Sequence, residues 1–252
     1  MPQISATIIT HNEGRNIARA IRSLGCTDEI IVVDSNSTDE TREIAADLGV
    51  RVIVRPWEGF ASQKNFSTTQ AHHDWILSLD ADEELDATAQ AAIREWKERV
   101  PAAAGYQFAR RARYLGRWIR HSGWYPDTKL RLFDRRLGRW EGPYVHESVV
   151  VEGRVESLRG EILHYTCDSI QEHRQRIEFY TYLAAQELFE KRKRVGFLQR
   201  LLAPGWVFLN TYFFRLAILD GYPGFLIARM AALYVARKYS KLARLNAGPS
   251  RS

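Results

Sequence analysis

The first hundred residues of the chain alternate short β-branched runs with segments of helical spacing. We predict strands at residues 4–10, 29–34, 51–55 and 75–80. Strands separated by helices are typical of a parallel sheet whose faces are covered by those helices. With 252 residues and 45% hydrophobic content, the chain can bury a full core as one large α/β domain, or as one domain with an appendage.

Three helices are predicted among these strands. The first spans residues 17–24, where apolar side chains recur at helical spacing. Ser37 and Glu40 are spaced as a capping box, which predicts a second helix ending at Gly49. A third helix is predicted at residues 88–100, before a proline.

The remainder of the chain has a different pattern. Residues 101–168 are irregular and rich in Arg, Trp, Tyr and Gly, with short strands predicted at 106–110, 129–134 and 162–165. Residues 169–252 are predicted to be a helical C-terminal region. Its longest uncharged run, 201–214, has 14 residues, which is short of the roughly 20 needed to cross a bilayer. We therefore expect interfacial or re-entrant membrane helices, with a helical pair packed on the core as the alternative.

Charge is divided unevenly along the chain. Residues 1–100 contain 10 Lys and Arg against 17 Asp and Glu, whereas residues 101–252 contain 26 against 13. The basic half is expected to face an anionic partner: phospholipid, phosphorylated glycolipid or nucleic acid. A basic surface that only confers solubility is the alternative.

The two cysteines, Cys26 and Cys167, form no CxxC motif, so neither a disulfide framework nor a zinc site is predicted. The N-terminus has no basic region followed by a long apolar run, so no export signal is predicted and a reducing cytoplasm fits. The sequence also lacks GxGxxG and GxxxxGK[ST], which argues against a dinucleotide dehydrogenase and a P-loop enzyme.

An acidic pair follows the predicted strand 75–80. In LDADEEL, Asp80 and Asp82 stand at the carboxyl end of the strand, where open α/β sheets bind ligands. Two neighbouring carboxylates repel each other unless a cation joins them. A divalent ion bridging them to a diphosphate would neutralise a leaving group. Plain turn and cap formation is the alternative for such residues.

Polar side chains also stand near three other strand ends. TIITHNE supplies Thr10 and Glu13, VVDSNSTDET supplies Asp34, and FASQKN places Lys64 on the approach to a helix. A carboxylate such as Asp34 can accept hydrogen bonds from a base or ribose, and Lys64 can meet a phosphate as a compact charge.

In this order and spacing, these motifs resemble glycosyltransferase family 2, the inverting enzymes built on the GT-A fold. The resemblance covers roughly residues 4–165 and implies a catalytic domain at 1–168, with a nucleotide-sugar half at 1–100 and an acceptor half at 101–168. It implies donor-binding roles for some of the matched residues and a DxD metal motif in others. The donor-binding positions are Thr10, Glu13, Asp34, Lys64 and Asp80, and the metal position is Asp82.

The stretch YPDTKLRLFDRRLGRWEGPYVHE, residues 125–147, resembles bacterial enzymes related to lipopolysaccharide inner-core β-1,4-glucosyltransferases. The resemblance implies Glu147 as the catalytic base, with Asp127 as a nearby substitute. His164, in ILHYT, resembles the C-terminal histidine that completes the metal shell in many GT-A enzymes, and a nitrogen ligand suits Mn²⁺ better than Mg²⁺. A solvated carboxylate and a packing histidine are the alternatives.

Basic residues interleaved with aromatic ones form a further cluster that we interpret as an acceptor cleft for a phosphorylated glycolipid, because guanidinium groups bind phosphates and aromatic faces stack on sugars. A surface for single-stranded nucleic acid has a similar composition, but no nucleic-acid module is recognisable. The cluster comprises Arg110, Arg111, Arg113, Tyr114, Arg117, Trp118, Arg120, Trp124 and Tyr125.

The resemblance thus implies a metal-dependent glycosyltransferase that moves a hexose by single displacement, with UDP-glucose as the first choice of donor. The expected acceptor is a lipopolysaccharide core or a related surface glycan, and the expected location is the cytoplasmic face of the inner membrane. No nucleic-acid partner is expected. The rivals are a nucleotidyltransferase, which would need a Gly-rich loop that THNEGRN lacks, and a catalytically silent membrane-associated or nucleic-acid-binding protein.

Overall fold

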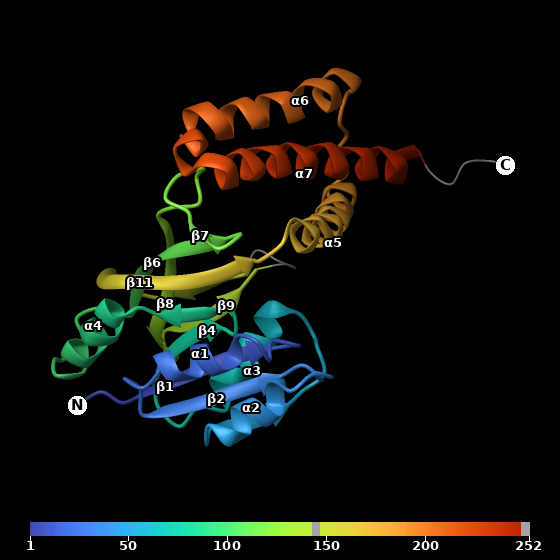
Figure 1. Cartoon of the computed structure of the whole chain (residues 1–252). Coiled ribbons are helices and arrows are strands. Elements are labelled where there is room, and N and C mark those ends of the chain that lie inside the picture. The colour runs from blue at the N-terminus through green and yellow to red at the C-terminus, as the bar shows by residue number, and fades with distance from the viewer. Residues whose placement is uncertain (143–146, 248–252) are drawn as a thin grey trace. The chain divides into compact units, whose positions relative to one another are not determined.

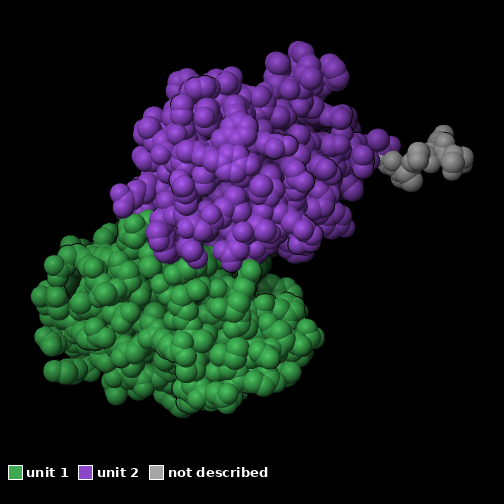
Figure 2. All heavy atoms as spheres, in the orientation of Figure 1, with its two compact units in different colours: residues 1–111, 127–165 green, residues 112–126, 166–252 purple. Residues whose placement is uncertain are grey.

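The computed structural model describes residues 1–142 and 147–247, and the chain forms two compact units. The first unit comprises Met1–Arg111 and Asp127–Tyr165, and the second comprises Ala112–Pro126 and Thr166–Ser252 (Figure 2). The second unit therefore takes a segment from the middle of the sequence in addition to the C-terminal region.

The first unit begins with the alternating strands and helices that the sequence predicts (Figure 1). The strands pair in parallel in the order β3-β2-β1-β4. The predictions for β1, β2 and β4 are confirmed to the residue, and β3 is one residue shorter than predicted. The elements in chain order are β1 (Ile4–Thr10), α1 (Ile17–Ser23), β2 (Glu29–Asp34), α2 (Thr41–Asp47), β3 (Arg51–Val54), α3 (Phe60–Thr69) and β4 (Trp75–Asp80).

Beyond β4 the sheet becomes antiparallel. Strand β8 pairs with β4 and β6, and β11 pairs with β5, all in antiparallel register. The sheet is therefore mixed. The prediction of a mostly parallel sheet holds for its N-terminal strands, and the later strands pair in antiparallel register. The later elements are β5 (Glu83–Leu85), α4 (Ala87–Lys97), β6 (Gly105–Tyr114), β8 (Asp127–Asp134), β9 (Gly138–Glu141), β10 (Ser148–Val151) and β11 (Val155–Cys167), with β9 and β10 forming a separate two-stranded ribbon.

Both faces of the sheet in the first unit are buried. On one face, side chains such as Ile8 and Leu77 pack against helices α1, α2 and α4. On the other, Ile9, Ile76 and Phe133 pack against α3 and the β9–β10 ribbon. A strand covered on both faces must be apolar at nearly every position, which explains the continuous runs that identified β1, β2 and β4 in the sequence.

The predicted capping box at the start of α2 is wrong. The helix begins at Thr41, the side chain of its N-cap residue Glu40 makes no capping hydrogen bond, and the N–H of Thr41 donates to Asp39 at 3.1 Å. Ser37 instead donates its hydroxyl to Asp34 and accepts the main-chain N–H of Asn12 at 2.8 Å. A serine used to join two loops cannot also cap a helix four residues later. The end of α2 is as predicted, with Gly49 at φ 74° just beyond it.

The second unit is mainly helical. It contains β7 (Arg117–Trp118), α5 (Ile170–Glu190), α6 (Phe197–Leu209), a π-helix η1 (Asn210–Phe214), a 3₁₀ helix η2 (Ala217–Asp220) and α7 (Gly221–Ala247). Helices α5 and α6 both pack against α7. A core of Tyr114, Ile119, Cys167, Leu226 and Ile227 joins the segment Ala112–Pro126 to α7.

The segment Ala217–Ala247 is long and apolar enough to cross a membrane by length and composition, with 33% of its most apolar window buried. Core helices of soluble proteins share these properties. The longest uncharged run, residues 201–214, lies in α6 and η1 and not in α7, because Arg229 interrupts the apolar part of α7.

Candidate active site

The predicted nucleotide-binding residues lie at one edge of the sheet. In the strand register, Thr10 is opposite Asp34 and Ile9 is opposite Asp80. Because β1, β2 and β4 are parallel, their carboxyl ends coincide, and this edge is where open α/β sheets bind ligands. The structure thus brings together Thr10, Asp34 and Asp80, which are separated by up to 70 residues in the sequence.

Hydrogen bonds connect the loop that follows β1 to the segment that follows β2. The main-chain N–H of Glu13 donates to Thr41 at 2.8 Å, and the Glu13 carboxylate accepts from Asn16 at 2.6 Å. Asp34 is fully buried and accepts the N–H of Ser37 at 2.9 Å. Thr10 Oγ1 is buried and has no hydrogen-bond partner within the described residues, so it is one donor or acceptor available to a ligand at this edge.

Lys64 connects the DxD motif to the predicted base. It lies within α3 and not on its approach, and its side chain is only 1% exposed. Its Nζ lies 2.8 Å from Asp80 Oδ1 and 3.0 Å from Glu147 Oε1, and 4.3 Å from the centre of the Trp140 ring. An ammonium buried this deeply requires paired carboxylates, and both come from residues that the sequence singled out. His146, next to Glu147, lies outside the described residues.

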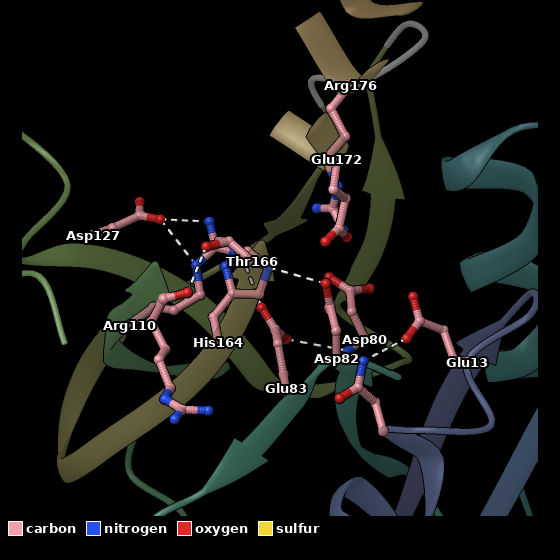
Figure 3. A network of polar contacts seen from close by, with 12 residues as sticks. Glu13, Asp80, Asp82, Glu83, Arg110, Asp127, His164, Thr166, Glu172 and Arg176 are labelled. Carbon is pink, nitrogen blue, oxygen red and sulfur yellow. Dashed lines mark hydrogen bonds and ion pairs between the residues drawn. The ribbon is translucent and has the colours of Figure 1, made fainter. Parts of the chain in front are cut away.

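Asp80 is also bound by Arg131 of β8, which starts a series of alternating charges. Arg131 Nη2 lies 3.0 Å from Asp80 Oδ2 and 2.8 Å from Glu83 Oε1. Arg110 Nη1 lies 2.9 Å from Glu83 Oε1, and its Nε donates to Asp127 Oδ2 at 2.9 Å (Figure 3). We call this set the ion-pair series; it runs through Asp127, Arg110, Glu83, Arg131, Asp80, Lys64 and Glu147.

The charges in the series stabilise one another. Burial by itself would raise the pKa of the Asp80 carboxyl, but Lys64 and then Arg131 lower it well below its usual range. Burial disfavours the charged form of Arg131, yet Glu83 and then Asp80 raise the pKa of the guanidinium above its usual value. Asp80 and Arg131 therefore both stay charged at neutral pH. The repulsion expected between Asp80 and Asp82 is relieved at Asp80 by protein cations, so that carboxylate does not depend on a metal ion.

Asp82 and His164 form a separate pair on the same edge. Their closest atoms, Oδ2 and Nε2, are 3.3 Å apart, and the main-chain carbonyl of Asp82 accepts from the N–H of Tyr165 on β11 (Figure 3). No group of three or more His, Cys, Asp or Glu side chains able to hold a metal ion occurs within residues 1–142 and 147–247. A carboxylate and an imidazole at this separation suit a shared divalent ion whose other ligands come from a diphosphate or water.

Three residues of the cluster predicted to bind the acceptor make contacts within the protein. Arg110 belongs to the ion-pair series, and Arg111 lies 2.7 Å from Glu161. Tyr114 is fully buried and packs against Trp124 with ring centres 5.6 Å apart. Tyr114 therefore cannot stack on a sugar ring, so the prediction is wrong for this residue, and for the rest of the cluster it stays a prediction.

Sequence reasoning missed Arg131 and Glu83, which hold the centre of the ion-pair series. Arg131 stands in the alternating pattern KLRLF, where it looks like the solvent-facing residue of a strand. It is 3% exposed because Trp140 and the carboxylates cover it. Glu83 follows the DxD motif directly, so three acidic residues stand within four positions. This spacing could have indicated that some of these carboxylates pair with buried cations.

Comparison with known sequences decides the family. The chain matches the family described as "Glycosyl transferase family 2" over residues 5–149. It belongs to glycosyltransferase family 2. An uncharacterized glycosyltransferase of Rickettsia prowazekii is 33% identical to this glycosyltransferase over 257 residues, which is 97% of this chain and 87% of its relative. The lipopolysaccharide core biosynthesis glycosyltransferase LpsC of Rhizobium meliloti is 32% identical, over 95% of this chain and 91% of its own.

Solved structures give weaker likenesses. TarS 1–349 of Staphylococcus aureus, in complex with UDP, superposes on this glycosyltransferase with a TM-score of 0.48 and 16% identity, over 99% of this chain and 93% of TarS. Glucosyl-3-phosphoglycerate synthase of Mycobacterium tuberculosis, solved with Mn²⁺, UDP and phosphoglyceric acid, reaches a TM-score of 0.30 at 30% identity over 33% of this chain and 34% of its own.

Proposed function

We propose that this glycosyltransferase transfers a hexose with inversion to a lipopolysaccharide core or related glycan, with UDP-glucose as the first choice of donor. The observation that carries the proposal is the contact of Glu147 with Lys64, which places a carboxylate beside the DxD edge. The acceptor class is supported by the likeness to LpsC, a lipopolysaccharide core biosynthesis glycosyltransferase, along nearly the full chain.

Glu147 is the proposed base. In the transfer, its carboxylate takes the proton of an acceptor hydroxyl while the acceptor oxygen bonds to the anomeric carbon. The bond from that carbon to the donor phosphate breaks, and its electron pair leaves with the nucleotide diphosphate. Lys64 Nζ donates to Glu147 Oε1 at 3.0 Å, which orients the carboxylate next to the DxD motif. A donor diphosphate bound at Lys64 would therefore lie next to the proposed base.

Asp82 and His164 are the proposed metal ligands. A divalent ion held there would act as a Lewis acid that stabilises the charge developing on the departing diphosphate. The anionic oxygen of Asp82 suits either Mn²⁺ or Mg²⁺, and the nitrogen of His164 favours Mn²⁺. Asp80, already neutralised by Lys64 and Arg131, would instead fix the position of Lys64 near the donor phosphates.

The C-terminal region is proposed to attach the enzyme to the cytoplasmic face of the inner membrane. Helix α6 has no buried residue, and its large apolar side chains are exposed: Phe197 by 75%, Leu198 by 67% and Trp206 by 61%. A surface of this kind, next to basic residues, is typical of a helix that lies in a bilayer interface.

The proposed function is tested with the Glu147→Gln variant and a panel of nucleotide sugars with Mn²⁺. The amide keeps the size of the side chain but cannot take the acceptor proton. Donor affinity should therefore remain, whereas release of UDP in the presence of acceptor should fall by about 10²- to 10⁴-fold, the usual contribution of a positioned base. The loss should lie in kcat and not in the donor KM.

Asp127→Asn is the matched control, because Asp127 is the other carboxylate at the end of the ion-pair series. It is held by Arg110 and by Lys129, whose Nζ lies 3.0 Å away. The control should retain most of its turnover. Near-normal transfer by the Glu147 variant with a collapse in the Asp127 variant would assign the base to Asp127. Absence of sugar transfer from every donor in the wild type would overturn the proposed function itself.

A further inference from the structure

A cavity of about 830 Å³ lies within the second unit, between helices α5 and α7, with Pro204 of α6 in its wall. Its volume is in the range of small-molecule sites, roughly 300–1,000 Å³. The apolar part of the lining includes Ile177 of α5 and Met230, Leu233 and Ala236 of α7. Ile177 and Met230 are buried, so the cavity has a preformed apolar floor.

The rest of the cavity wall carries an excess of positive charge. Arg174 of α5 and Arg229 and Arg237 of α7 line it, against one carboxylate, Glu178. Glu178 is shared between Lys241 at 2.8 Å and Arg237 at 3.4 Å. Within the described residues, neither Arg174 nor Arg229 has an ion pair with a carboxylate. Two exposed guanidinium groups in an apolar cavity are suited to binding phosphate oxygens.

The surface beside the cavity indicates which kind of ligand would carry such a phosphate. Helix α6, which contributes Pro204, exposes Leu198, Leu201 and Leu202 just before that proline. An apolar surface next to a cationic cavity matches the layer of a bilayer in which acyl chains meet phosphate headgroups. A soluble phosphate ester would have no need of the apolar floor.

We propose that this cavity binds one anionic lipid, with its headgroup phosphate on Arg174 and Arg229 and the upper part of its acyl chain against Met230 and Leu233. The binding site would hold the second unit at a fixed depth and orientation on the membrane. The inference rests on the proposed membrane attachment and is independent of which sugar is transferred.

The test uses short-chain lipids below their micelle concentration, so that binding to the cavity is measured without a vesicle surface. Dihexanoyl phosphatidylglycerol should raise the melting temperature of the full chain, because it binds the folded state. Dihexanoyl phosphatidylcholine and inorganic phosphate, at the same concentration, should have much smaller effects. Equal stabilisation by inorganic phosphate would overturn the assignment to a lipid.

The Arg174→Gln, Arg229→Gln double variant should bind dihexanoyl phosphatidylglycerol about tenfold more weakly or worse, because it loses both charged donors. The matched control is Lys193→Gln, Arg194→Gln, which removes the same charge from exposed positions outside the cavity and should bind as the wild type does. Ala236→Trp fills the cavity without a change of charge and should also abolish binding.

An affinity of the Arg174, Arg229 variant within about twofold of the wild type would refute the cavity site, since a tenfold loss is expected from the removed contacts. Sedimentation with vesicles of phosphatidylcholine and phosphatidylglycerol tests membrane attachment independently of lipid binding in the cavity. If the wild type sediments but the short-chain lipid does not bind, the cavity assignment fails alone. If the wild type does not sediment, the proposed membrane attachment fails.

Discussion

Replacement of Arg131 by methionine should lower the free energy of unfolding by about 3–5 kcal/mol, the usual cost of removing one partner from a buried ion pair. Methionine roughly preserves the volume of the aliphatic stem but removes contacts of 3.0 Å to Asp80 and 2.8 Å to Glu83. Glu83 is 1% exposed and would keep Arg110 as its cation, while Asp80 would keep Lys64. Because neither carboxylate is left without a partner, we expect the lower end of the range.

Urea unfolding, followed by tryptophan fluorescence and circular dichroism, measures the loss. The Glu83→Gln variant and the Arg131→Met, Glu83→Gln double variant complete a double-mutant cycle, in which direct coupling of about 1–3 kcal/mol is expected. Arg139→Met is the matched control, because Arg139 pairs with Glu141 on the surface with its side chain 63% exposed. That change should cost less than about 1 kcal/mol.

A loss below about 1 kcal/mol for Arg131→Met would refute the reasoning, because it would equate a buried pair with an exposed one. Strict additivity of the two single-variant losses in the double variant would also refute the reasoning, since residues in direct contact should couple. In either case the ion-pair series would be a set of neighbouring charges without mutual support.

Three further predictions follow from the site and the second unit. Asp82→Asn should weaken Mn²⁺-dependent binding of the UDP-sugar by about tenfold or more, roughly 1.4 kcal/mol, in calorimetric titrations with and without Mn²⁺; an unchanged affinity would remove Asp82 from the metal site. Leu198→Glu, Leu202→Glu should release the full chain from anionic vesicles into the supernatant, since the charges occupy an exposed apolar surface; retention in the pellet would place the attachment elsewhere. Burial, followed by the charge of Arg176, lowers the pKa of His173 from 6.5 to about 4. As the pH falls, the unfolded chain therefore takes up a proton at this histidine before the folded chain does. The contribution of His173 to the free energy of unfolding should be fully present above pH 6.5 and should fall by up to about 3 kcal/mol as the pH decreases to 4. His173→Gln should flatten that decrease in melting temperature, and an unaltered pH profile would show that His173 is not its source.

The sequence predicted the parallel half of the sheet well because local composition determines it. Strands β1, β2 and β4 are buried on both faces, so their apolar runs are continuous and have clear ends. The same strand ends located Thr10, Asp34 and Asp80 at one edge. Lys64 was singled out as a basic residue before a helix and Glu147 by resemblance, and their contact across 83 positions of sequence could not be read from spacing.

Other features depend on contacts between distant segments and could not be predicted locally. Strand β5 has three residues, too few for a pattern, and forms because β11 pairs with it. The segment Ala112–Pro126 belongs to the second unit through Tyr114, whose burial against Ile227 and Cys167 has no local signal. Ser37 matched a capping box, but a hydrogen bond from the neighbouring loop used the same hydroxyl.

The ion-pair series makes its positions interdependent in any laboratory evolution of donor preference. A substitution at Lys64 or Arg131 removes one of the two cations that pair with Asp80, so single changes at these positions lower stability by about 3 kcal/mol and are selected against whatever their effect on donor choice. Libraries that vary the residues in charge-conserving pairs, such as Arg131 with Glu83, would retain folded proteins. Selection would then act on the shape of the donor pocket.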